Sequence, residues 1–559
     1  MKLTNIKYTW ITTVISVLFF TGCDLDRFPE SELSDVVYWQ TEKDYMMAAN
    51  YLYRASHVSD YVTDYFLRAD IMSDDAFGLG PNNISNGTFI PSSNFGPWKQ
   101  DYQVIRAANN ILEKAGSSSL AREVLARFEA EARFFRAYAY FDLVRRYGDV
   151  PLVLRSLDGD AEELYMERTP RGVVMDTIYK DLDYAAMHLP LAGELNIDEE
   201  YGRITSGAAL TLKSRAALFE GTFNKYHGSG GSGASGNASY HLQIAKAAAW
   251  AVMQSGEYGL FDNYGMDSYR MLFKNAGEGP ENKEAIWVYR YGFSEFNIVN
   301  SNKFILDVSI YGDLCVTGAL VDSYLCADGL PIDKSGEYQG KTFAGSEFLN
   351  RDPRLDGTVV KPGDHYFNGY IIIGGAGWIP TMHTATGYPF EKYQDIDGGN
   401  LDHIMFRYAE VLLNYAEASY ELNETISDAD LDLSINLLRS RVGMPHLSNA
   451  FVLANDLNMR EEIRRERRAE LSLEGFRYND LIRWKTAEIE LPKPVLGVRF
   501  FDAEYPGDDP SSVNLTADSI VIAEAANKRS FDAAKHYLWP IPLNELSLNP
   551  NLKQNPNWE

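Results

Sequence analysis

The sequence predicts a mostly α-helical fold, because helical periodicity occurs in both halves of the chain and an irregular, glycine-rich stretch separates them. Of 559 residues, 45% are hydrophobic and 23% are charged, which is typical of a folded globular chain. The clearest helical pattern is one apolar stripe formed by Ala132, Phe135, Ala139 and Leu143. Gly148 follows that stripe and predicts the end of the helix.

The first half of the chain is expected to form helices joined in pairs, with small residues at positions where helices pack closely. The expected helices cover residues 125–146, 171–189, 206–221 and 240–255. Such pairs resemble tetratricopeptide repeats, although no strict period of about 34 residues is visible. The Gly/Ser stretch between the last two helices predicts a flexible loop.

An irregular insert, rich in Gly, Tyr, Asp and Pro, is expected at residues 261–402. It contains strand-like pieces at 285–291 and 370–373. Closing helices are predicted at 403–422, 428–442 and 458–484. The sequence therefore predicts an N-terminal helical region, 23–260, and a C-terminal region, 261–559, packed together as one body.

Residues 1–22 are predicted to be a signal peptide rather than part of the fold. Lys2 and Lys7 precede an apolar run of 11 residues at 10–20, which is too short to span a bilayer. The run is followed by Thr21-Gly22-Cys23, a pattern that resembles a bacterial lipobox, so we expect lipid modification of this cysteine; ordinary cleavage that leaves a free cysteine is the alternative. Acidic residues directly after Cys23 resemble a surface-export signal, which predicts an outer-membrane anchor and a position facing the cell exterior.

The composition excludes several classes of function. The net charge of −26 argues against binding of nucleic acid or of anionic lipid through a basic patch. Nine histidines are scattered without zinc-site spacing, so no metal and no cofactor are expected.

Cys315 and Cys326 could pair in an exported protein, but buried free thiols are favoured. The run 460–474 holds five Arg and five Glu, which indicates a solvated or inter-helix ionic face.

Aromatic residues on Gly- and Asn-rich loops are the candidate ligand contacts, because a ring can stack on a sugar while nearby polar groups bind its hydroxyls. For each ring, packing of the loop onto the core is the alternative. We expect stacking by Trp98, Tyr291 and Trp378, with Phe77 flanking the same loop as Trp98, and hydrogen bonds from sugar hydroxyls to Asp74 and Asp75. No pair of carboxylates is marked as catalytic by its position.

Nine segments, in order along the chain, resemble the SusD/RagB family of Bacteroidetes outer-membrane nutrient-uptake lipoproteins. They are 129–153, 171–190, 202–221, 320–332, 351–355, 406–418, 436–445, 463–484 and 537–557. One departure is Thr317-Gly318, where the family usually has Pro-Thr.

The resemblance implies a mostly α fold in which four tetratricopeptide-like helix pairs support an irregular ligand-binding face. It also implies a partner, a SusC-type TonB-dependent transporter over which the lipoprotein acts as a lid, and no catalysis. The ligand is expected to be a glycan, with a peptide as the first alternative. A helical glycosidase and a purely structural scaffold for transporter assembly are the remaining alternatives.

Overall fold

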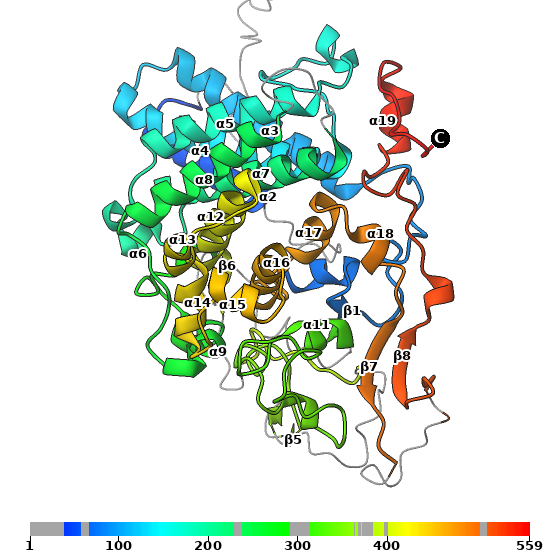
Figure 1. The fold of residues 1–559 in the computed structure, drawn as a ribbon. Coiled ribbons are helices and arrows are strands. Elements are labelled where there is room, and N and C mark those ends of the chain that lie inside the picture. The colour runs from blue at the N-terminus through cyan, green and yellow to red at the C-terminus, as the bar shows by residue number, and fades with distance from the viewer. Residues whose placement is uncertain are drawn as a thin grey trace, which may run out of the picture.

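The computed structural model describes residues 38–56, 66–228, 237–290, 314–362, 364–366, 370–371, 384–395, 401–502, 511 and 513–559. Within these residues, long helices form a layer, and short helices, short strands and loops form a second region beside it (Figure 1). The mostly α-helical fold predicted from the sequence is confirmed.

The helical layer consists of helices that pack on one another largely in chain order (Figure 1). Its members are α2 (Glu42–Ser56), α3 (Gly96–Ser117), α4 (Arg122–Tyr147), α5 (Arg171–His188), α7 (Ser206–His227), α8 (Ala238–Gln254) and α12 (Tyr408–Asn423). Each helix from α3 to α8 contacts the next long helix, and α12 closes the series against α8. The layer is thus an array of adjacent helices with a continuous apolar interior.

Helix α4 lies at the centre of this layer and is buried around most of its circumference. The predicted stripe of Ala132, Phe135, Ala139 and Leu143 is at most 1% exposed. The helix ends at Gly148, whose N–H donates to the Val144 carbonyl at 2.9 Å. The φ angle of Gly148 is 74°, a left-handed conformation that favours glycine and stops the helix where the sequence predicts.

The second region contains antiparallel strand pairs and short helices. The strand pairs are β1 (Ala76–Phe77) with β3 (Cys315–Val316), β2 (Ala285–Tyr289) with β6 (His403–Arg407), β4 (His365–Tyr366) with β5 (Tyr370–Ile371), and β7 (Val495–Arg499) with β8 (Ile520–Glu524). The short helices are η1 (Phe66–Met72), α6 (Ile197–Glu200), α9 (Ser268–Leu272), α11 (Gly318–Ser323), α13 (Asp428–Asp432), α14 (Ile435–Arg441), α15 (Asn449–Ala454), α16 (Met459–Glu470), α17 (Arg477–Arg483), α18 (Ala487–Glu490) and α19 (Leu543–Leu548).

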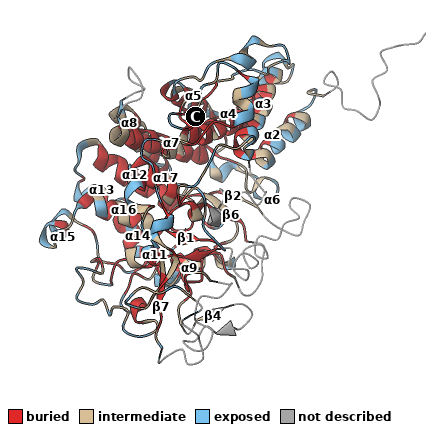
Figure 2. Cartoon of the chain, turned by 90° about the vertical axis from the view of Figure 1, so that its right-hand side faces the viewer, coloured by how far each residue is buried: buried red, intermediate tan, exposed pale blue. Residues whose placement is uncertain are grey.

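Two apolar cores correspond to these two regions. The larger core runs through the helical layer, where buried residues line α4, α7 and α12 (Figure 2). The smaller core is built mainly by the insert and includes Tyr269, Val316, Tyr388 and Val498. Because each region buries its own apolar side chains, the contacts that join the regions decide how the insert is held.

A buried ionic network provides part of that junction. Glu470 of α16 accepts hydrogen bonds from Arg354 at 3.0 Å, Arg407 at 2.7 Å and Arg441 at 2.7 Å. Arg354 also donates to Glu466 at 2.6 Å. Burial alone would raise the pKa of Glu470, but the three guanidiniums outweigh burial and hold that pKa well below its usual value. The network therefore fixes the insert, β6 and α14 to one face of α16.

This network corrects one prediction about the charged run at 460–474. The run is an inter-helix ionic face, as one of the two expectations stated, but much of it is not solvated. Glu462, Glu466, Arg467 and Glu470 are all at most 3% exposed. Glu466, Arg467 and Glu470 are compensated by arginines and carboxylates from other segments rather than by water, whereas Glu462 pairs with Arg465 of the same run.

The closing helices are shorter than predicted. Residues 403–407 form β6 instead of the first helical turn, because they pair with β2. The segment 428–442 is broken between α13 and α14. The segment 458–484 is broken after Glu470, where Leu473 and Gly475 have φ angles of 57° and 76°. Left-handed residues cannot continue an α-helix, so the chain turns there before α17 begins.

Candidate ligand-binding face

Four segments that are distant in sequence meet within the smaller core, and we call them together the strand junction. They are residues 74–77, 314–317, 384–390 and 495–499. β1 pairs with β3, and the Val316 N–H donates to the Tyr388 carbonyl at 2.9 Å. The Val498 N–H donates to the Thr386 carbonyl at 2.8 Å. The junction is thus a hydrogen-bonded framework that runs from β1 to β7.

Local features of the sequence allow these segments to approach one another. The Thr317 hydroxyl donates to the Asp74 carbonyl at 2.5 Å and accepts from the Leu320 N–H at 3.2 Å, which caps α11. The Thr317 N–H donates to the Asp75 carbonyl at 3.0 Å. A Cβ on Gly497 would lie 2.0 Å from the Thr386 carbonyl oxygen, so only glycine permits this backbone contact.

Tyr291 and Trp378, two of the predicted stacking residues, lie outside the described residues. The described chain resumes after them at Leu314 and at Thr384, and each of these residues begins a segment of the strand junction. The Thr386 hydroxyl donates to the Val316 carbonyl at 2.5 Å, which ties the two returning segments together. The segments that begin at Leu314 and at Thr384 therefore belong to one framework.

Asp74 and Asp75 are in the interior, at 8% and 1% exposure. Arg468 donates to Asp75 at 2.7 Å and to Asp74 at 3.0 Å, and Arg477 donates to Asp74 at 2.8 Å and 2.9 Å. Burial would raise the pKa of Asp74, but Arg468 and Arg477 outweigh it and hold that pKa far below its usual value. The expected role as acceptors for sugar hydroxyls does not fit this position, and the carboxylates instead hold β1 against α16 and α17.

Phe77 and Trp98 are also buried, at 5% and 4% exposure. Phe77 lies on β1 opposite Cys315. Trp98 lies in the first turn of α3, with its ring centre 5.1 Å from that of Tyr102 and 4.8 Å from that of Tyr147. Both rings therefore pack in the core, which is the alternative to ligand contact stated above. Trp98 offers no open face on which a sugar could stack.

The start of helix α3 has a local signal in the sequence, which the interpretation of Trp98 as a loop residue overlooked. Pro97 occupies the start of α3, a position that favours proline, and Trp98, Tyr102 and Ile105 follow at helical spacing. The buried charges of α16 have a similar signal. Glu466 and Glu470 stand 3 and 7 residues after buried Ile463, so they share its face. No spacing rule, however, indicates that Arg468 and Arg477 pair with Asp74, nearly 400 residues away.

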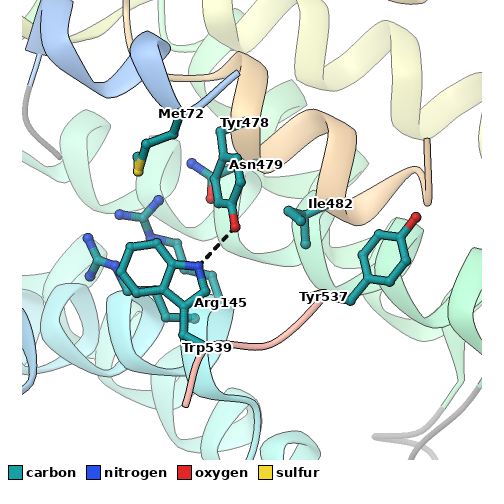
Figure 3. Close-up of a pocket in the computed structure, with 8 residues that line it drawn as sticks. Met72, Arg145, Tyr478, Asn479, Ile482, Tyr537 and Trp539 are labelled. Atoms are coloured by element: carbon teal, nitrogen blue, oxygen red, sulfur yellow. Dashed lines mark hydrogen bonds between the residues drawn. The ribbon is translucent and has the colours of Figure 1, made fainter. Parts of the chain in front are cut away.

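A small cavity lies away from the strand junction, between η1, the end of α4, α17 and the C-terminal chain (Figure 3). Its lining residues are Met72, Arg145, Arg146, Tyr478, Asn479, Ile482, Tyr537 and Trp539. The Trp539 indole donates to the Tyr478 hydroxyl at 2.9 Å across one side of it (Figure 3). The cavity has room for about one water molecule, which is too little for a sugar ring.

Other features of the described residues bear on the remaining expectations. Cys315 and Cys326 are buried free thiols, as favoured from the sequence. No group of three or more His, Cys, Asp or Glu side chains within the described ranges is arranged to hold a metal ion. In the same part of the chain, no helix has both the length and the apolar character needed to cross a membrane. Cys23 lies outside the described residues.

Comparison with known proteins gives matches along nearly the whole chain. One family profile, described as the SusD family, matches residues 282–558. A second, described as starch-binding associating with outer membrane, matches residues 33–218.

Individual relatives match over similar lengths. A SusD-like protein, P38, of Formosa agariphila is 25% identical over 99% of both chains. A SusD-like protein of Bacteroides ovatus is 25% identical over 86% of this chain and 82% of its own. A crystal structure of a SusD-like carbohydrate binding protein from Bacteroides fragilis is 26% identical, covers 92% of this chain and 99% of its own, and superposes with a TM-score of 0.73. The surface glycan-binding protein A of Bacteroides fluxus shares the fold, at 20% identity over 92% of this chain and 99% of its own, with a TM-score of 0.60.

Proposed function

Because the chain belongs to the SusD family of non-enzymatic binding proteins, we propose that it binds a glycan through loops of the insert that are attached to the buried strand junction, and delivers it to a SusC-type TonB-dependent transporter in the outer membrane. The observation that carries the proposal is the similarity to SusD-like proteins along nearly the whole chain, one of which is described as a carbohydrate binding protein. Tyr291 and Trp378 are the aromatic residues that we propose to stack on the glycan.

The choice of a carbohydrate ligand is supported by relatives and by side-chain chemistry. The Bacteroides fragilis relative is described as a carbohydrate binding protein. Tyr291 and Trp378 lie in segments rich in Gly and Asn, where rings can stack on sugar C–H faces while amides and backbone groups bind hydroxyls. No cofactor is required for this function.

The proposed location is the outer membrane, through a lipid anchor on Cys23 and facing the cell exterior. The description of the N-terminal family profile, which associates it with the outer membrane, supports this location. The apolar run at 10–20 that ends before Cys23 supports the anchor, since two or three acyl chains hold a protein firmly in a bilayer. An anchored protein whose face binds glycan is suited to work with a transporter in the same membrane.

The proposal is tested by affinity electrophoresis and calorimetry of the purified chain against soluble starch, arabinoxylan, pectin, yeast mannan and mucin. We expect saturable binding to one polysaccharide class. Tyr291→Ala and Trp378→Ala are each expected to weaken it about 5- to 150-fold, by analogy with stacking of about 1–3 kcal/mol per ring. Tyr165→Ala is the matched control, because it removes an exposed ring from the N-terminal helical region, between α4 and α5.

Two results would contradict the proposal. Absence of binding across the panel, together with saturable binding of a peptide library, would assign the face to peptide capture. Unchanged glycan affinity in both Tyr291→Ala and Trp378→Ala would place the ligand elsewhere on the molecule. Co-purification of the transporter with the tagged chain from outer membranes tests the partner separately.

A further inference from the structure

Loop 339–346 of the insert exposes an aromatic ring that the sequence interpretation did not select. Phe343 is 47% exposed among the described residues. Gln339 and Thr342, which are also exposed, bring an amide and a hydroxyl to the same loop. An open ring with uncharged hydrogen-bonding groups beside it is the surface that a sugar requires.

The loop is held in shape by one buried side chain. Ser346 is fully buried, and its hydroxyl oxygen accepts the N–H of Thr342 at 2.9 Å and that of Phe343 at 3.2 Å. The same hydroxyl lies 2.7 Å from the Gly340 carbonyl, to which it can donate. Gly345 has a φ of 84° and turns the chain back toward Ser346. Because the backbone is fixed, little conformational entropy is lost when a ligand contacts the ring.

The loop is attached to the strand junction. Arg499, the last residue of β7, donates from its guanidinium to the Lys341 carbonyl at 2.7 Å. On the other side, a Cβ on Gly345 would lie 3.4 Å from the Pro362 ring. Phe343 is therefore carried on a loop that is attached to β7 of the strand junction.

The charges around the loop favour a neutral ligand. Lys341 is the only charged residue within 339–346. Its ammonium lies 3.2 Å from an Asp322 oxygen and 3.4 Å from a Glu347 oxygen, so its charge is compensated within the protein. An uncompensated cation would attract phosphate or carboxylate groups, whereas a compensated one leaves stacking and neutral hydrogen bonds as the available contacts.

We propose that Phe343 forms a second carbohydrate contact at the edge of the strand junction, stacking on a sugar ring of the same uncharged glycan chain. The inference rests on the proposed function, because it extends that binding face by one platform. It adds a ring that is visible in the described structure to two that were selected from sequence alone.

The test compares Phe343→Ala, Phe343→Trp and Tyr165→Ala in titrations with the uncharged polysaccharide of the panel (starch, arabinoxylan or mannan) that the unmodified chain binds, and binding to acidic pectin or mucin alone would overturn the proposal. Phe343→Ala is expected to raise Kd about tenfold. Phe343→Trp keeps a ring and Tyr165→Ala removes one elsewhere, so both should stay within about twofold of the unmodified chain. Thermal unfolding should be unchanged in all three, since both positions are exposed.

The two proposals fail in different ways. Glycan binding that is equally strong in Phe343→Ala overturns the second contact and leaves the proposed function standing. An equal loss in Phe343→Ala and Tyr165→Ala also overturns it, because the effect is then not specific to the loop. Weakened recovery of the transporter with unchanged glycan affinity would assign Phe343 to a protein contact instead. Absence of binding by the unmodified chain overturns both proposals.

Discussion

Charged residues near the strand junction serve structure before they serve a ligand. Asp74 and Asp75 are surrounded by Arg468 and Arg477, with nitrogen–oxygen distances between 2.5 Å and 3.8 Å. Removing one arginine would leave buried carboxylates with less compensation, and desolvated charge without a partner is costly. Partial burial likewise disfavours the charged form of a titrating ring, as at His227.

Arg468→Ala is expected to lower the free energy of unfolding by about 3–5 kcal/mol, because its partners Asp74 and Asp75 stay buried. The control is Arg155→Ala. Arg155 pairs with Glu163 at 2.6 Å, but the two side chains are 50% and 40% exposed, so a loss below about 1 kcal/mol is expected. Urea denaturation followed by circular dichroism measures both, and equal losses would contradict the buried-pair argument.

His227 should make the protein less stable as the pH falls from 6.5 to 4. Burial lowers the pKa of His227 to about 4, and its ring stacks on Phe223 at 4.1 Å. The unfolded chain takes up a proton near pH 6.5 while the folded chain does not, so protonation favours unfolding throughout this window. The loss reaches up to about 3 kcal/mol and is complete below pH 4.

The measurement is the urea midpoint at several pH values for the unmodified chain and for His227→Gln and His446→Gln. His227→Gln should flatten the dependence between pH 6.5 and 4. His446 is 59% exposed, so its replacement should leave the slope unchanged. An unchanged slope in His227→Gln would show that other groups cause the pH dependence.

At the scale of helices and strands, elements that depend on neighbouring residues can be predicted from the sequence, whereas elements that depend on pairing with distant residues cannot. The ends of α4 and α5 agree with the predicted segments within a few residues, since apolar spacing and Gly148 are local signals. β6 was predicted as helix because its pairing with β2, more than 100 residues earlier, has no local signal. The break after Glu470 lies at Leu473 and Gly475, and Gly475 is a local signal that the prediction of one helix over 458–484 overlooked.

The N-terminal cap of α11, Thr317, can be tested by substitution. Thr317→Val removes the cap of α11 and the hydrogen bond to the Asp74 carbonyl, so we expect a loss of about 2 kcal/mol in stability. It should also weaken glycan binding, because the end of β3 would lose one of its attachments within the strand junction. Ser427→Ala, which removes the cap of α13 far from this face, should cost about 1 kcal/mol and leave binding unchanged. Unaltered binding in Thr317→Val would separate this cap from the function.

At the scale of the whole molecule, packing decides which residues of the candidate site are accessible. The loop after the first helix and the insert were expected to carry ligand contacts, and segments of both meet at the strand junction. Trp98 and Asp74 were misassigned, because a ring or a carboxylate in a Gly-rich stretch has the same local sequence whether it faces water or the core. Only three-dimensional packing separates these cases.

The location is tested on the full-length chain expressed in a Bacteroidetes host. Cys23→Ser should abolish incorporation of a labelled fatty acid and release the protein from the outer-membrane fraction, because the predicted acylation site is lost. Cys326→Ser, which alters a buried thiol, should retain both the label and the membrane fraction. Membrane association that persists without label in Cys23→Ser would indicate attachment by another route.

The buried ionic network has a consequence for how this protein can diverge. Apolar packing tolerates many relative orientations, but guanidinium–carboxylate pairs are directional and permit few. Glu470 and its three arginines therefore fix the orientation of the insert independently of the sequences of its surface loops. Loops on the outer face can be exchanged or lengthened by mutation while the framework beneath them keeps its register. One scaffold can thus acquire new ligand preferences through a few surface substitutions while its fold stays the same.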